Sequence, residues 1–442
     1  MDAPALRDDY YCSLLAYSHT VECLAVGLGP HVYLWSESRG TTNIPDSLTA
    51  PLGTSHVTSV SFSSREGGSS ILAIGRADGR ITLWSPLDRD PRFDSEQPAP
   101  VSCVAFRPTT VKRTSMRDGT TTVSTEELLV GDEIGYVYYY SVEWPTQQQR
   151  DLFDWHGSMT LLARICCHSQ QVCGIAWSPG GETFATGGND NQLFLFESKN
   201  ILRRSTGIKA SSASTPTVHV RSGSSGSLSN ATVSGQSEVL SIGPGQERQV
   251  FALNAAVKAI AFAPWQTTLV AAGGGSNDRC IHFFHTLSGA SLATIDCHAQ
   301  VTSLVWSDKK KEIAATFGFA QPEHPYRVAV FAWPSCRMVV GIPWLGEERA
   351  LYAVAYPRGP SGGQTGIVAG RADSEGRPWY GKRTREEGCL VVATSDASIK
   401  FHEIWTERQD DCGKRRTSGL LGGSQILEGD CSPEVESRYA IR

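Results

Sequence analysis

Residues 172–196 read VCGIAWSPGGETFATGGNDNQLFLF, which divides into three short apolar segments separated by two turns. The segments 172–177, 183–188 and 192–196 place apolar side chains in the pattern of β-strands. Pro, Gly, Asn and Asp fill the positions between them, and these residue types favour tight turns. The stretch therefore predicts three strands joined as an antiparallel meander.

The same unit recurs along the whole chain. Its last strand follows a turn rich in Gly, Asp or Asn and closes on an aromatic residue, as seen at 31–35, 78–84, 135–140, 189–196, 277–284, 328–333 and 395–401. A strand similar to 172–177 precedes most of these, as at 57–62, 101–106, 257–262 and 301–306. A repeat of about 40 to 50 residues with several strands is typical of WD repeats. The sequence predicts an all-β fold, a seven-bladed WD40 β-propeller over residues 1–405.

Three stretches interrupt the repeat, at about 109–127, 198–248 and 358–388. They are rich in Ser, Gly, Thr and Arg and poor in large apolar side chains, so burial cannot offset the entropy of ordering them. We expect disordered loops there. We expect a flexible polar tail over 406–442, which ends in Ile-Arg.

Closing a propeller normally pairs the two ends of the chain within one blade, because this protects the edges of the first and last sheets. The opening segment 8–15 is therefore expected beside the last blade. This arrangement places Asp9 near Asp396.

The composition argues against nucleic acid and membranes as partners. The formal net charge is -5, from 40 Lys and Arg against 45 Asp and Glu, so there is no overall basic field for nucleic acid. No apolar run approaches the roughly 18 residues needed to cross a bilayer. The 12 cysteines are scattered and no export signal precedes them, which predicts mostly reduced, buried thiols and a location in the nucleus and cytoplasm.

No known catalytic motif occurs in the chain. Histidines such as His56, His168 and His298 stand just before strands, where buried hydrogen-bond networks are a better explanation than acid–base catalysis. Cys166, Cys167 and His168 lack the spacing of zinc ligands. We expect no enzyme activity, no metal and no cofactor.

Several strings go beyond a generic WD repeat: LRDDYY at 6–11, HSQQVCG at 168–174, VKAIAFAPWQ at 257–266, GGG at 273–275 and GFAQ at 318–321. They resemble the fizzy family, whose members are activators and degron receptors of the anaphase-promoting complex, a ubiquitin ligase. The string CSLLAYS at 12–18 is most similar to the fungal meiosis-specific activators. The resemblance implies a substrate-recruiting activator that controls cell-cycle or meiotic progression.

The resemblance also implies two sites for degrons, the short motifs that mark substrates. For a KEN motif the family positions fall on Asn189, Asn191, Ser276 and Arg349. Amides can bond the backbone and Asn side chain of the motif, and Arg349 can pair with its Glu.

For a destruction box, R-x-x-L, Asp9 matches one of two family acids that face the Arg. The second position is Ala397 where the family has Glu, which puts affinity for this motif in doubt. Asp396 is the candidate to compensate.

At the other end, Ile441 and Arg442 match the Ile-Arg pair that the family inserts into a tetratricopeptide-repeat subunit of the ligase. The implied partners are subunits of that complex and degron-bearing substrates such as cyclins or securin, with no nucleic acid and no membrane. Family members carry an activating C-box before the propeller, and this chain has no room for one. Either Met1 is an internal residue of a longer product, or the protein is a WD-repeat scaffold or decoy receptor that does not activate.

Overall fold

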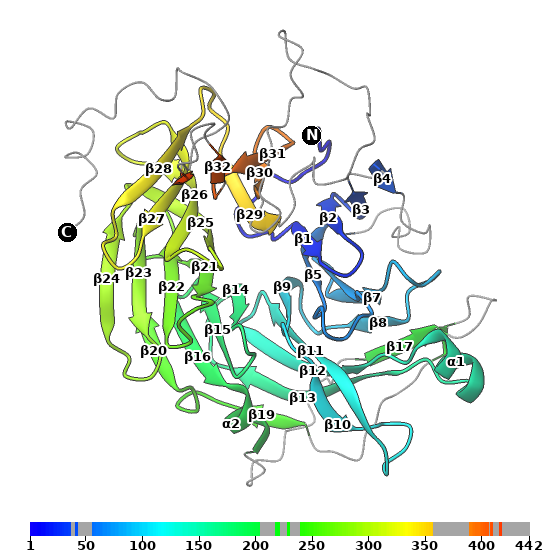
Figure 1. The fold of residues 1–442 in the computed structure, drawn as a ribbon. Coiled ribbons are helices and arrows are strands. Elements are labelled where there is room, and N and C mark those ends of the chain that lie inside the picture. The colour runs from blue at the N-terminus through cyan, green and yellow to red at the C-terminus, as the bar shows by residue number, and fades with distance from the viewer. Residues whose placement is uncertain are drawn as a thin grey trace.

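The computed structural model describes residues 1–36, 40–42, 55–203, 217–221, 228–229, 239–356, 389–405, 407–409 and 415–417. Seven sheets of three or more strands follow one another around a ring, which confirms the predicted propeller (Figure 1). The first strand of each blade contacts the first strand of the next, and β1 (Leu15–Ser18) contacts both β5 (Val57–Phe62) and β29 (Ala350–Tyr356). The ring is therefore closed.

The described strands of the propeller divide among seven blades in chain order. Blade 1 holds β1, β2 (Cys23–Leu28), β3 (His31–Ser36) and β4 (Gly40–Thr42), and blade 2 holds β5, β6 (Leu72–Arg76), β7 (Arg80–Trp84) and β8 (Phe93–Glu96). Blade 3 holds β9 (Val101–Phe106), β11 (Thr122–Asp132), β12 (Tyr136–Glu143) and β13 (Ser158–Cys166), and blade 4 holds β14 (Val172–Trp177), β15 (Thr183–Gly188), β16 (Gln192–Glu197) and β20 (Gln249–Ala252). Blade 5 holds β21 (Val257–Phe262), β22 (Leu269–Gly274), β23 (Cys280–His285) and β24 (Ser291–Asp296), and blade 6 holds β25 (Ala299–Trp306), β26 (Glu312–Ala320), β27 (Tyr326–Ala332) and β28 (Met338–Pro343). Blade 7 holds β29, β30 (Cys389–Thr394) and β31 (Ser398–Glu403).

Apolar side chains fill the spaces between neighbouring blades. Phe283 of blade 5 packs in one cluster with Trp306 and Phe317 of blade 6, and Leu83 of blade 2 shares another with Tyr138 of blade 3. Each sheet therefore buries both of its faces against its neighbours, which explains why the strands are so apolar. Among the described residues, no helix is both long and apolar enough to span a bilayer.

The first residues of the chain supply the missing strand of blade 7. The backbone of Met1 exchanges two hydrogen bonds with Ile399, and the amide of Ala3 donates to the carbonyl of Ala397 over 2.8 Å. The opening segment does lie beside the last blade, as predicted, but residues 1–3 make the pairing rather than 8–15. Figure 1 shows the blue N-terminal segment against the orange strands of this blade.

The prediction of disorder at 109–127 is wrong. Strand β10 (Val111–Thr114) pairs with the first half of β11, and the resulting hairpin extends blade 3. Polar contacts to Glu127 and Glu143 order it in place of apolar burial.

The other predicted loops are only partly described. Within 198–248, helix α2 (Ser198–Arg203) and β19 (Leu240–Ile242) are ordered, and β17 (Thr217–Arg221) and β18 (Leu228–Ser229) extend blade 2. The whole of 358–388 lies outside the described residues. In the predicted tail, β32 (Glu407–Gln409) and β33 (Arg415–Thr417) form a hairpin, and a short helix α1 (Gln147–Phe153) precedes β13.

Candidate functional site

The connections between blades define two faces of the propeller. In a four-stranded meander, the turn from the second to the third strand lies on the same side as the link from the fourth strand to the next blade. We call this side the top face. Asn189 and Asn191 lie between β15 and β16, Ser276 lies between β22 and β23, and Arg349 immediately precedes β29. All four predicted KEN-contacting residues therefore lie on the top face.

The side chain of Asp190 fixes the turn that bears Asn189 and Asn191. The Asp190 carboxylate interacts with Nδ1 of His168 at 3.0 Å and accepts from the amides of Ser169 and Gln192. Burial raises the pKa of Asp190, but the hydrogen bond and charge of His168, together with the amides of Ser169 and Gln192, outweigh burial and lower the pKa overall. Asn191 adopts a φ of 65°, a conformation that Asn tolerates better than most residues.

The three predicted network histidines differ in the structure. His168 is buried, as expected, and its Nε2 lies 2.9 Å from the hydroxyl of Thr186. His298 instead has a side chain 32% exposed and pairs with Asp296, and His56 is only half-buried.

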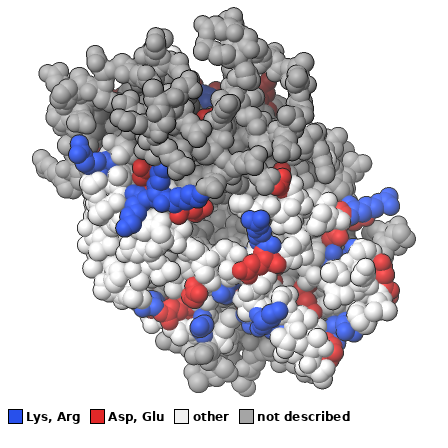
Figure 2. All heavy atoms as spheres, viewed as in Figure 1, with Lys and Arg blue, Asp and Glu red and all other residues white. Residues whose placement is uncertain are grey.

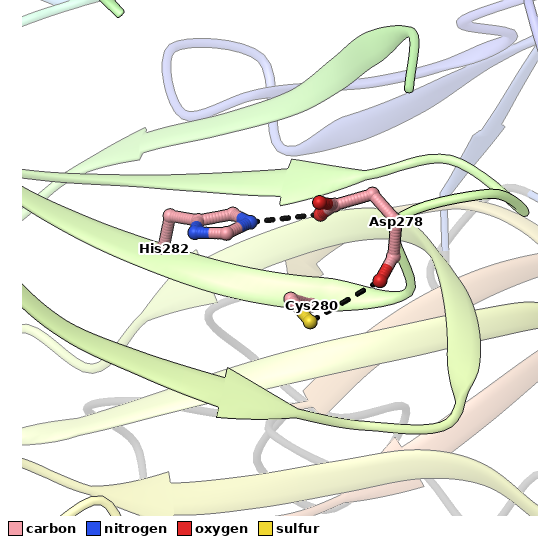
Figure 3. Close-up of side chains that lie close together, drawn as sticks. All are labelled: Asp278, Cys280 and His282. Carbon is pink, nitrogen blue, oxygen red and sulfur yellow. Dashed lines mark hydrogen bonds and ion pairs between the residues drawn. The ribbon is translucent and has the colours of Figure 1, made fainter. Parts of the chain in front are cut away.

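Ser276 is exposed in the β22–β23 turn. A cluster of side chains just after it holds this turn in place, and Figure 3 shows the cluster. The cluster consists of Asp278, Cys280 and His282, the one set of potential metal ligands within 4.8 Å of one another among the described residues. Both Asp278 oxygens are already used, since one accepts from Asn254 and the other lies 2.8 Å from His282 Nε2.

The thiol of this cluster is also occupied. Cys280 donates to the carbonyl of Asp278 over 3.2 Å, and burial followed by the charge of Asp278 raises the pKa of the thiol to about 12. These contacts lock the β22–β23 turn, which explains the cluster without a metal ion.

Arg349 is the charged member of the predicted site. Its guanidinium forms an ion pair with Asp8 and lies 5.6 Å from the centre of the Tyr10 ring. Its backbone is fixed by reciprocal hydrogen bonds with Ser395, which precedes the turn into β31. Burial raises the pKa of Tyr10, and the charge of Arg349 opposes this shift.

Residues 7–12 form a strap across the top face, which sequence reasoning missed. Tyr11 donates from its hydroxyl to Oδ1 of Asn189 over 3.1 Å, and the Cys12 carbonyl accepts from Nζ of Lys258 over 2.8 Å. A Cβ on Gly318 would lie only 2.5 Å from the Tyr10 ring, so this ring packs where only glycine leaves room. The motif DDYY was a possible signal, but nothing in it identifies contact partners so distant in sequence.

Asp9 and Asp396, the predicted destruction-box residues, are each bound by their own neighbours. Asp9 accepts from the backbone amide of Tyr11 over 2.8 Å and lies 3.7 Å from Arg7. Asp396 accepts from the hydroxyls of Thr394 and Ser398. Burial raises the pKa of Asp396, yet these hydrogen bonds lower it overall.

No interaction joins Asp9 to Asp396 among the described residues, and their predicted proximity stays a prediction. Ala397 sits between Asp396 and β31 in a left-handed conformation with φ of 56°. The predicted ligase-binding residues Ile441 and Arg442 lie outside the described part of the chain. On the face shown in Figure 2, basic and acidic side chains are interspersed.

Comparison with known proteins places the chain among WD-repeat proteins. The model of the WD domain, G-beta repeat, matches residues 159–197. A chain in the crystal structure of a mitotic checkpoint complex is similar with a TM-score of 0.59 and 25% identity, over 91% of this chain and 89% of that one.

Two fungal relatives match almost the whole sequence. Meiotic fizzy-related protein 2 of Schizosaccharomyces pombe is 30% identical over 97% of this chain and 67% of its own length. Meiosis-specific APC/C activator protein AMA1 of Saccharomyces cerevisiae is 28% identical over 97% of this chain and 61% of its own length. The chain thus spans about two thirds or less of the length of these curated relatives.

Proposed function

The chain belongs to the fizzy-related family of WD-repeat proteins, and on this premise we propose that it is a non-catalytic degron receptor. It binds short substrate motifs on its top face and delivers them to the anaphase-promoting complex/cyclosome, in the nucleus and cytoplasm. The relatives named for meiosis support a meiotic role. The substrates we expect are proteins with exposed KEN motifs, such as cyclins or securin.

One observation carries the proposal: three separate connections bring two amides, a hydroxyl and a guanidinium to the same face. These are the side chains of Asn189, Asn191, Ser276 and Arg349, and all of them are at least partly exposed. Such groups suit a short extended peptide, because amides bond its backbone and polar side chains while the guanidinium bonds a carboxylate.

A fluorescent KEN peptide tests this directly by anisotropy. We expect a dissociation constant in the micromolar range, since a short flexible motif loses entropy when it is ordered. Arg349→Ala should weaken binding, because it removes the partner of the peptide Glu. Arg337→Ala is the matched control, since Arg337 is exposed between β27 and β28 on the opposite face. Equal affinities for wild type and Arg349→Ala would remove Arg349 from the site.

The alternative is a scaffold or decoy receptor that binds degrons without delivering them. Attachment through Ile441 and Arg442 to a tetratricopeptide-repeat subunit distinguishes the two. Deleting both residues should abolish capture of that subunit while peptide binding stays unchanged. A full chain that binds the peptide but never captures the subunit would favour the decoy.

A further inference from the structure

The strap is fixed at both ends but free of backbone pairing in its middle. Residues 1–3 pair with β31, and at the other end Ser13 exchanges backbone hydrogen bonds with Thr58 and Val60 of β5. Between these anchors, the strap meets the top face through side chains and the Cys12 carbonyl. Its position is therefore set, while individual side chains in it can still turn.

This strap contacts two of the four predicted KEN-contacting residues. The Asp8 carboxylate pairs with the Arg349 guanidinium, and the Tyr11 hydroxyl donates to Oδ1 of Asn189. The side chains of Asn191 and Ser276 have no hydrogen bond or ion pair within the described part of the chain. The occupied groups are the ones that would receive a carboxylate and a hydrogen-bond donor from a ligand.

We propose that the strap is a built-in competitor, in which Asp8 and Tyr11 occupy Arg349 and Asn189 until a peptide carboxylate and donor replace them. This inference rests on the proposed degron site and adds how its affinity is set. The two interactions are of the same kind, because Asp8 and the Glu of a ligand would each place a carboxylate against the guanidinium of Arg349.

The competition is weak enough for a ligand to win. The side chains of Asp8 and Arg349 are 46% and 37% exposed, and exposed ion pairs contribute little to stability. Tyr10 stays packed against Gly318, so displacement needs only the side chains of Asp8 and Tyr11 to turn away. We expect the strap to reduce ligand affinity by about two- to fivefold, the range that follows from a weak surface pair.

Asp8→Asn tests the inference with little change of shape. It removes the charge that holds Arg349, so a KEN peptide should bind about two- to fivefold more tightly. A peptide with Gln in place of the motif's Glu should gain nothing, because it brings no carboxylate. Tyr11→Phe, which frees Asn189 Oδ1, should strengthen both peptides alike.

A matched control distinguishes competition by Asp8 from a general effect of removing negative charge on peptide affinity. Glu133→Gln removes one exposed acid from another top-face turn, between β11 and β12, and should leave both affinities unchanged. An equal gain from Glu133→Gln and Asp8→Asn would overturn the inference, as would unchanged or weaker binding of the KEN peptide to Asp8→Asn.

The same binding measurements distinguish failure of the strap competition from failure of the proposed degron site. If wild type binds the peptide and Arg349→Ala weakens it while Asp8→Asn has no effect, only the strap competition is wrong. If neither wild type nor Asp8→Asn binds any KEN peptide, the degron site fails and this inference fails with it.

Discussion

Buried polar side chains in this propeller are generally matched with a partner, and His402 on β31 is an exception. It is 8% exposed and stacks on Trp344 with ring centres 5.7 Å apart, yet neither ring nitrogen has a hydrogen-bond partner among the described residues. Burial, followed by the charge of Lys400, lowers the pKa of His402 to about 4. The folded protein therefore holds this imidazole neutral.

His402 should make stability depend on pH. In the unfolded chain a histidine takes up a proton below about pH 6.5, whereas folded His402 does not until about pH 4. The free energy of unfolding should therefore fall as pH decreases between these values, by about 2 kcal/mol from pH 7 to pH 5 for this residue alone. Denaturant unfolding of wild type and His402→Phe at both pH values measures the contribution. If the two proteins lose the same amount of stability, His402 is not the buried neutral group described here.

The residues of the candidate site were predictable only in part. Asn189 and Asn191 stand in a turn that the sequence indicates directly, and family resemblance pointed to Ser276 and Arg349. The strap contacts were not predictable, since Tyr11 and Asn189 are 178 positions apart, and Asp8 and Arg349 are 341 apart. Contacts at such separations depend on how the ring closes, which no local pattern encodes.

At the scale of strands and turns, apolar patterning was a sound guide wherever a strand is buried on both faces. It failed at 109–127, because the β10–β11 hairpin is ordered by charge. Glu127 is fully buried, pairs with Arg107 at 2.8 Å and with Arg113, and accepts from the Tyr139 hydroxyl over 2.5 Å. A composition rule that counts large apolar residues cannot detect such an arrangement, since its members look like those of a polar loop.

Glu127→Gln should therefore destabilise the hairpin strongly. The substitution leaves two guanidinium groups facing a neutral amide, and removing one partner of a buried ion pair costs about 3–5 kcal/mol. Denaturant unfolding gives the loss, and limited proteolysis within 110–125 reports whether the hairpin opens.

Lys112→Ala is the control for this substitution, because Lys112 bonds Ser124 at the exposed surface of the same hairpin. It should change stability by less than about 0.5 kcal/mol. Similar small effects from both variants would show that the charge network does not order the hairpin.

For the whole molecule, closure of the ring connects stability with function. The same N-terminal segment completes blade 7, crosses the top face as the strap and then enters blade 1, so the edge of the last sheet and the candidate site share one piece of chain. Seven repeats in the sequence were enough to predict the ring. The exact closing residues were not, because residues 1–3 are too few to show a strand pattern.

Ala3→Pro tests whether this pairing closes the propeller. Ala3 is 1% exposed and its amide donates to Ala397, a donor that proline lacks. Losing a buried hydrogen bond should lower the free energy of unfolding by about 1–3 kcal/mol. Asp2→Ala, a change to an exposed side chain on the same segment, should have little effect.

The variant should also change how the protein behaves in solution. An unpaired β31 would present backbone donors and acceptors at a sheet edge, and such edges pair with other chains. We expect Ala3→Pro to self-associate in sedimentation velocity at concentrations where Asp2→Ala stays monomeric. Its affinity for a KEN peptide should also vary from molecule to molecule, because the strap loses its anchor. An Ala3→Pro protein that unfolds at the wild-type midpoint and remains monomeric would mean that packing between the inner strands of blades 1 and 7 closes the ring without the help of residues 1–3.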